Sequence, residues 1–267
     1  MKAKPFPDCS YLHGLAKQAG RVMRTHFDSD LTSTWKEDET PVTIADHAIN
    51  SLVRSQLSRD FPGITLVGEE GGHHIQDSEY RIFEDSIDGT IPYVASLPVS
   101  TFCISVLKGN EPIAAVIHDP FLKRTWMAGR GEGAFLRSKE VSRQLHVSDK
   151  TSLKRSHVSL IGWKGSQYNL PEVTARVQQA GAKWSNLCSI AICGGLIARG
   201  TMEASVFPAI RGWETAAMQL LVEEAGGKAT DIHGRLLTYG QNAEIEGHII
   251  SNGHLHDELV QIVAECQ

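Results

Sequence analysis

Residues 85–90 read Asp-Ser-Ile-Asp-Gly-Thr and follow the apolar pair Ile82-Phe83. Two carboxylates, Asp85 and Asp88, therefore stand close to the end of a short apolar run. A carboxylate beside a buried strand is unfavourable unless its charge is compensated, and a divalent cation is a common compensation. The intervening Ile87 offers its backbone carbonyl as a further oxygen ligand while its side chain enters the core. The hexapeptide alone is equally compatible with a capped turn whose acids are solvated.

Two more acidic segments stand at the ends of apolar runs or at helix starts. Glu69 follows the run 64–67 and its closing Gly68, and Glu214 follows Trp213 at the start of a helical pattern. Oxygen donors without paired His or Cys favour Mg²⁺ or Mn²⁺ over zinc. The recurrence of this pattern favours a metal site over a set of solvated turns.

Hydrophobic periodicity predicts the elements around these acids. Helices are predicted over 12–23, 44–57, 171–180, 189–199, 213–224 and 255–264. Strands are predicted over 64–67, 82–85, 101–107, 113–117, 124–127, 158–161, 202–207 and 248–251. Because no regular βαβ order is present, the pattern favours a layered α+β fold over a doubly wound sheet.

The polar segment 148–156 predicts a soft boundary near Thr151. An N-terminal α+β part (1–150) would carry most of the metal ligands, and a C-terminal α/β part (151–267) would complete the site. We expect the two parts to form one compact unit. The glycine-rich segment 129–133 superficially suggests a nucleotide loop, but it opens no helical pattern and predicts a hairpin instead.

Composition restricts the classes of function. The 26 Lys and Arg residues against 31 Asp and Glu residues give a net charge of −5, which argues against a nucleic acid polymer or an anionic membrane as partner. No secretory signal or membrane span is predicted. The five cysteines contain no CxxC pair, so we expect reduced thiols in a cytoplasm.

The motifs resemble the inositol monophosphatase superfamily of magnesium-dependent, lithium-sensitive phosphatases. Residues 85–90 resemble its D-P-[IL]-D-G-T signature, and 213–217 with 224–227 resemble its W-D-x-A-A and E-A-G-G elements. Residues 68–70 match its G-E-E element, and 42–46 match its V-T-x-x-D element. The resemblance spans most of the chain and implies an αβαβα sandwich of the inositol monophosphatase/fructose-1,6-bisphosphatase type, assembled as a homodimer.

The resemblance also implies a set of metal ligands. Glu69, Asp85 and the carbonyl of Ile87 would hold a first Mg²⁺. Asp85, Asp88 and Glu214 would hold a second ion, and Glu69 would help to bind a looser third. Mn²⁺ is the expected substitute for Mg²⁺.

Catalytic and phosphate-binding roles follow from the same resemblance. Thr90 and Asp46 would orient the attacking water and help to deprotonate it, with Glu69 beside them. The N–H groups of Gly89 and Thr90 would bind phosphate oxygens. Metal ions that activate water and stabilise the leaving oxygen would supply most of the remaining catalysis.

Some positions depart from the family pattern. Ser86 replaces proline, and Glu214 replaces aspartate and adds one methylene group. Phe207 stands where inositol-preferring relatives carry an acid, and an apolar ring cannot accept hydrogen bonds from polyol hydroxyls. Arg211, which stands two residues before Trp213, either reaches a second charge on the substrate or pairs with a surface acid.

The leading hypothesis is a Mg²⁺-dependent phosphomonoesterase that acts on a small polyol or sugar phosphate, such as inositol-1-phosphate. Fructose-1,6-bisphosphate, histidinol phosphate and 3′-phosphoadenosine 5′-phosphate are alternatives within the same chemistry. A catalytically weakened member that only binds a phosphorylated ligand is the alternative from another class, and the departures at Ser86, Phe207 and Glu214 favour it. The presence of every charged ligand together with Asp46 and Thr90 favours the enzyme.

Overall fold

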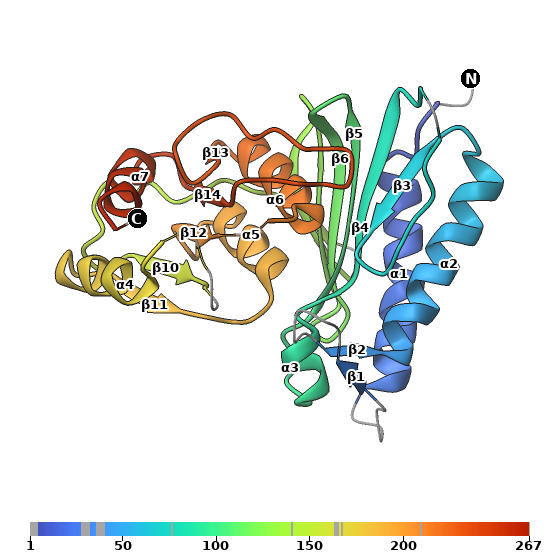
Figure 1. The fold of residues 1–267 in the computed structure, drawn as a ribbon, viewed down its shortest axis with the longest axis horizontal. Coiled ribbons are helices and arrows are strands. Elements are labelled where there is room, and N and C mark those ends of the chain that lie inside the picture. Colours follow the sequence, from blue (N-terminus) through green and yellow to red (C-terminus); the bar gives the residue numbers. More distant parts are fainter. Residues whose placement is uncertain are drawn as a thin grey trace.

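The computed structural model describes residues 5–27, 33–35, 41–75, 77–139, 141–162, 166, 168–208 and 210–266. It is a sandwich in which three layers of helices alternate with two sheets (Figure 1). This arrangement confirms the predicted α+β class and the αβαβα sandwich. No helix in the described ranges combines the length and the apolar character needed to span a membrane.

Helices α1 (Cys9–His26) and α2 (Ile44–Asp60) form the first layer. The buried side chains of α1 recur at helical spacing and face the neighbouring sheet; they are Leu12, Leu15, Ala16, Ala19 and Met23. Helix α2 begins with a capping box in which Thr43 and Asp46 each accept a hydrogen bond from the other's backbone. Both predicted helices are present: α1 extends a few residues beyond both predicted ends, and α2 begins where predicted and extends beyond its predicted C-terminal end.

The larger sheet has seven strands in the order β3-β4-β5-β6-β7-β8-β9. Only β3 and β4 are parallel neighbours, and the other pairs are antiparallel. The strands are β3 (Thr65–Gly68), β4 (Tyr80–Asp88), β5 (Thr101–Lys108), β6 (Glu111–Asp119), β7 (Arg124–Gly129), β8 (Gly133–Ser138) and β9 (Val141–Gln144). The register of β4 against β5 shifts between Asp85 and Asp88, so a bulge opens within the signature hexapeptide.

Short elements surround the end of β4. Strands β1 (Ser33–Trp35) and β2 (Pro41–Thr43) form a small antiparallel sheet, and α3 (Thr90–Val94) follows the bulge directly. Helix α3 and β2 pack together at one end of the large sheet, as Figure 1 shows. The start of α2, the bulge of β4 and α3 therefore lie in one region.

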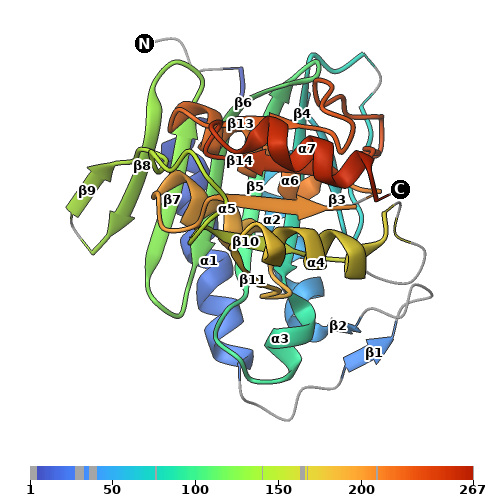
Figure 2. The ribbon, with the colours of Figure 1, turned by 90° about the vertical axis from the view of Figure 1, so that its left-hand side faces the viewer.

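The smaller sheet has five strands in the order β11-β10-β12-β14-β13. Its strands are β10 (His157–Leu160), β11 (Lys183–Ser185), β12 (Ala204–Phe207), β13 (Lys228–Thr230) and β14 (His248–Ser251). Helices α5 (Ile190–Ala198) and α6 (Trp213–Glu224) lie between the two sheets, and α4 (Leu170–Gln179) and α7 (His256–Ala264) form the outermost layer (Figures 1 and 2).

Three apolar cores hold the described layers together: one between the first helices and the large sheet, one on both faces of the α5/α6 layer, and one between the small sheet and the outermost helices. The central core, between the sheets, contains α5 and α6 and requires small residues. A Cβ atom at Gly195 would lie 2.4 Å from the ring of Trp126, and one at Gly194 would lie 2.6 Å from Met218. The small side chains of α5 thus let this helix approach the large sheet and α6 closely.

The segment 129–133 is a hairpin turn, as predicted, with Gly129 paired to Gly133. The N–H groups of Gly131 and Gly133 both donate to the carboxylate of Glu224, at 2.9 Å each. The turn therefore binds a carboxylate of the protein itself, which accounts for its glycines without a nucleotide. The division of the chain at residue 150 stays a prediction.

Candidate metal centre

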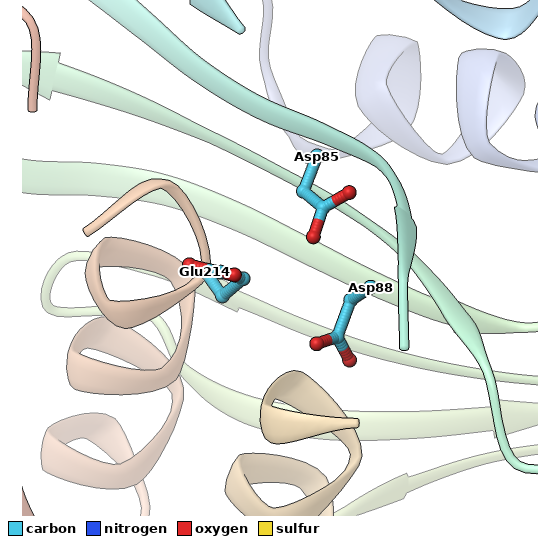
Figure 3. Close-up of side chains that lie close together, drawn as sticks. All are labelled: Asp85, Asp88 and Glu214. Carbon is cyan, nitrogen blue, oxygen red and sulfur yellow. The ribbon is translucent and has the colours of Figure 1, made fainter. Parts of the chain in front are cut away.

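Three carboxylates converge where the end of β4 meets the start of α6. One oxygen atom each from Asp85, Asp88 and Glu214 lies within 4.8 Å of the others, and all three residues are buried. Figure 3 shows the three side chains directed toward one another from β4 and α6. The fold thus brings Glu214 beside Asp85 and Asp88, although the two signature motifs that contain these acids lie far apart in the sequence.

Asp88 is fixed by the start of α5, a contact that the sequence analysis missed. Its carboxylate accepts hydrogen bonds from the hydroxyl groups of Thr101 (2.9 Å) and Ser189, and from the N–H groups of Ile190 (2.8 Å) and Ala191 (3.0 Å). The positive end of the helix dipole supports this arrangement. A serine directly before an apolar helical run is the sequence signal for such a helix start.

Asp85 has fewer hydrogen-bond partners than Asp88. Its Oδ1 accepts from the N–H of Ile87 at 2.9 Å. Burial raises the pKa of Asp85 well above its usual value, and the negative charges of Glu69 and Glu214 raise it further. Within the described part of the chain, neither Asp85 nor Asp88 forms an ion pair with Lys or Arg.

These residues fit a hard divalent cation. All three clustered donors are carboxylate oxygens, they are buried, and Asp85 and Asp88 lack a compensating cationic side chain among the described residues. Such a donor set suits cations that prefer oxygen ligands. Glu69 lies outside the tight cluster: it begins the loop after β3, and its N–H donates to the carbonyl of Glu84 at 3.1 Å.

Asp46 and Thr90 each bind another partner in this structure. Asp46 Oδ2 accepts from the N–H of Thr43 at 2.8 Å and from its hydroxyl at 2.6 Å. Thr90 Oγ1 donates to the carbonyl oxygen of Ile87 at 3.1 Å. No hydrogen bond joins Asp46 to Thr90 among the described residues, although both border the same end of β4, and their joint action on the attacking water stays a prediction.

Gly89 cannot be replaced without moving the start of α5. Its φ is +84°, in the left-handed region that favours glycine. A Cβ atom at this position would lie 2.8 Å from the Cβ of Ser189 and 2.9 Å from the carbonyl oxygen of Cys188. The glycine of the signature therefore lets β4 and α5 meet, which in turn lets Asp88 reach the start of α5.

Phe207 and Arg211, the two expected substrate contacts, have partners within the protein. The ring of Phe207 lies at the end of β12, is 8% exposed and lies 5.5 Å from the ring of His248. Arg211 Nη1 lies 3.0 Å from Glu244 Oε1. Of the two alternatives for Arg211, the structure thus shows the pairing with a surface acid.

Comparisons with known proteins agree with this geometry. The family model described as the inositol monophosphatase family matches residues 8–267. The chain belongs to the inositol monophosphatase family. It is 35% identical to a histidinol-phosphatase of Mycobacterium tuberculosis, over 92% of this chain and 94% of that protein. It is 32% identical to a histidinol-phosphatase of Streptomyces coelicolor, over 95% of each.

A solved structure confirms the fold. An inositol monophosphatase of Thermotoga maritima superimposes with a TM-score of 0.84 at 25% identity, and the match covers 96% of each chain. Members of the inositol monophosphatase family are metal-dependent phosphomonoesterases that act on small phosphorylated substrates. The buried carboxylate cluster of this family member is thus a candidate site for the catalytic metal.

Without metal, this family member is expected to lose stability as the pH rises. Burial raises the pKa of Asp46 to about 6 and that of Glu84 to about 7. These pKa values exceed those of the same groups in the unfolded chain. The two acids therefore stabilise the folded state fully below about pH 4, and this contribution is lost as the pH rises through 6 and 7. We expect the melting temperature in chelator to fall by about 5 °C or more between pH 5 and pH 8.

Thermal melting across this pH range, with and without a divalent cation, measures the effect. With the cation present, the melting temperature should fall less between pH 5 and pH 8, because the cation compensates the charge of the neighbouring carboxylates. A melting temperature that stays constant or rises from pH 5 to pH 8 in chelator would contradict the assignment of these buried acids.

Proposed function

We propose that the chain hydrolyses a small phosphomonoester with two or three bound Mg²⁺ ions, for which Mn²⁺ can substitute. The convergence of Asp85, Asp88 and Glu214 is the observation that carries this proposal. When bound, the cations would lower the pKa of water and stabilise the leaving oxygen. In this proposal the ligand set is completed by Glu69 and by the carbonyl of Ile87.

The other polar groups at the end of β4 would then handle the water and the phosphate. Thr90 and Asp46 would orient the attacking water and take up its proton, and the N–H groups of Gly89 and Thr90 would bind phosphate oxygens. The hydroxyl of Thr90 now donates to the carbonyl of Ile87. Because a carbonyl that binds a cation is a poorer acceptor, loading of the site would release this hydroxyl for the water.

We propose histidinol phosphate as the first candidate substrate. Two relatives with more than 30% identity over nearly the whole chain are named histidinol-phosphatase. Phe207 is apolar where inositol-preferring relatives carry an acid, and Arg211 is engaged by Glu244. Histidinol carries an imidazole ring and has fewer hydroxyl groups than a polyol, so it needs fewer hydrogen-bond acceptors near Phe207.

A panel of phosphomonoesters tests this proposal. Phosphate release is measured with histidinol phosphate, inositol-1-phosphate, fructose-1,6-bisphosphate and 3′-phosphoadenosine 5′-phosphate, each with Mg²⁺, with Mn²⁺ and with chelator. We expect kcat/KM for histidinol phosphate to exceed that for inositol-1-phosphate by about 10–100-fold, because an apolar pocket rejects an added hydroxyl by up to about 10²-fold. Protein with Asp88→Asn, prepared identically, controls for contaminating phosphatases.

The possible outcomes separate the hypotheses. A preference for inositol-1-phosphate would overturn the choice of substrate and leave the chemistry intact. Absence of metal-dependent release from every ester would favour the alternative of a weakened, ligand-binding member.

The proposal also covers assembly, location and partners. We propose that the protein forms a homodimer, is located in the cytoplasm, and acts on a small phosphorylated substrate and not on a nucleic acid polymer.

A further inference from the structure

A second polar cluster lies on the opposite face of β4 from the metal carboxylates. Glu84 directly precedes Asp85, and successive side chains of a strand point to opposite faces. Glu84 is completely buried and faces α2. Its Oε1 accepts from the hydroxyl of Ser86 at 2.7 Å, and its Oε2 accepts from the side-chain amide of Asn50 at 3.4 Å.

This cluster connects three segments that carry expected site residues. Asn50 stands one turn after Asp46 on α2, and its amide also donates to the carbonyl of Gly71 at 2.9 Å. The loop that ends at Gly71 begins with Glu69, whose N–H donates to the carbonyl of Glu84. Asn50 and Glu84 therefore tie α2, the loop after β3 and the bulge of β4 to one another.

The cluster packs closely against the backbone at Gly68. A Cβ atom at Gly68 would lie 2.8 Å from Glu84 Oε2, 2.8 Å from the carbonyl oxygen of Gly71 and 3.1 Å from the amide nitrogen of Asn50. The glycine of the G-E-E element is thus required by the contact between the loop and this cluster. Displacement of Glu84 would move both the loop and the bulge.

We propose that Asn50, Glu84 and Ser86 are positioning residues for the metal ligands, with Glu84 at their centre. Ser86 lies between Asp85 and Ile87, where the family signature has a proline. A proline ring would restrict the backbone of the bulge directly. In this chain the hydrogen bond from Ser86 to Glu84 supplies the restraint instead, and Asn50 extends it to the loop that bears Glu69.

Metal affinity is the property that this cluster should control, an expectation that rests on the proposed metal-dependent function. Glu84→Gln preserves size but places an NH₂ group where an oxygen now accepts from Ser86 or Asn50. Loss of partners that hold metal ligands typically lowers metal affinity by about 10–100-fold. We therefore expect the Kd for Mn²⁺, measured by calorimetry, to rise by about 10–100-fold, with a smaller rise for Ser86→Ala.

Glu203→Gln is a matched control directly before β12 of the other sheet. Glu203 is also buried, accepts from the N–H of His157 at 2.6 Å and pairs with Lys150 at 3.2 Å. Glu203→Gln should lower the melting temperature without changing the Kd for Mn²⁺. Wild-type affinity in both Glu84→Gln and Ser86→Ala would overturn the proposal, as would an equal loss in Glu203→Gln.

A double variant tests the replacement of proline directly. Glu84→Leu alone should weaken Mn²⁺ binding, because Ser86 then lacks its acceptor. Glu84→Leu combined with Ser86→Pro should recover most of the affinity, since the ring restrains the bulge without a partner. A double variant as weak as Glu84→Leu would overturn this part. Failure of the proposed function would be seen separately, as absence of metal-dependent phosphate release from the wild-type protein, whereas the outcomes above are differences in the Kd for Mn²⁺ between variants.

Discussion

Asp88→Asn is expected to lower Mg²⁺-dependent turnover by about 10²–10³-fold, a larger effect than that of any other single substitution. Asp88 shares the cluster with Asp85 and Glu214. An amide removes the negative charge that a divalent cation requires, and electrostatic contacts of this kind typically contribute a factor of about 10²–10³ each. Phosphate release under saturating Mg²⁺ measures the loss. Retention of more than about 5% of the wild-type rate would show that Asp88 is not a ligand.

The same variant should also become less stable, which separates Asp88 from its neighbour. Both oxygens of Asp88 accept N–H groups from α5, so an asparagine must direct its own NH₂ toward Ile190 or Ala191. Asp85→Asn is the matched control, because among the described residues only one oxygen of Asp85 accepts a hydrogen bond, and the amide can keep it. In chelator, Asp88→Asn should lower the melting temperature, whereas Asp85→Asn should maintain or raise it by removing repulsion.

The sequence predicted the long elements well and the short ones poorly. Helix α1 was predictable because its buried residues recur at helical spacing. Strand β9 was not, since all of its side chains are exposed and no alternation reveals it. Strands β11 and β13 have three residues each, too few for a pattern. Strand β4 begins earlier than predicted, because Tyr80 and Arg81 do not belong to an apolar run.

The site shows the same division between local and distant information. Asp85, Asp88 and Glu214 could be predicted because each stands at the end of a strand or at the start of a helix. The hydrogen bond from Ser189 to Asp88 joins residues 101 positions apart, and no local pattern encodes that pairing. The contact of Arg211 with Glu244 was an open alternative, since a charged residue in a loop reveals nothing about its partner.

Glu84 could have been noticed in the sequence. It is an acid inside the run from Ile82 to Asp85, which was predicted to be a buried strand, and a buried carboxylate needs hydrogen-bond donors. The donors themselves are less predictable: Ser86 is local, but Asn50 reaches Glu84 only because α2 covers that face of the sheet. The pattern thus indicates that a polar cluster exists without indicating its members.

Glu214→Asp is expected to lower activity by about tenfold or more, although it restores the residue typical of the family. Shortening the side chain by one methylene withdraws the carboxylate by about 1 Å, and a displacement of this size is costly at a catalytic site. Recovery would require α6 to move toward Asp85 and Asp88. The longer side chain of Glu214 is therefore required only if the start of α6 cannot move toward Asp85 and Asp88.

The start of α6 is held closely. The N–H of Gly212 donates to the carbonyl of Ala243 at 2.8 Å. A Cβ atom at Gly212 would lie 2.9 Å from the side chain of Ile245 and 3.1 Å from the ring of Tyr239. Beyond the first turn, α6 is buried between the two sheets, so a shift of the helix would disturb the central core. We therefore expect the shorter carboxylate to fall short rather than the helix to follow it.

Titration of the rate against Mg²⁺ for wild type, Glu214→Asp and Glu214→Gln separates reach from charge. Glutamine keeps the length and removes the charge, whereas aspartate keeps the charge and removes the length. Because we expect both the length and the charge of Glu214 to be needed, both variants should need more Mg²⁺ for half-maximal rate than wild type. A lower requirement in Glu214→Asp would mean that α6 moves and that glutamate is merely tolerated. Three coincident curves would mean that Glu214 does not bind the metal, because neither its length nor its charge would then affect metal binding.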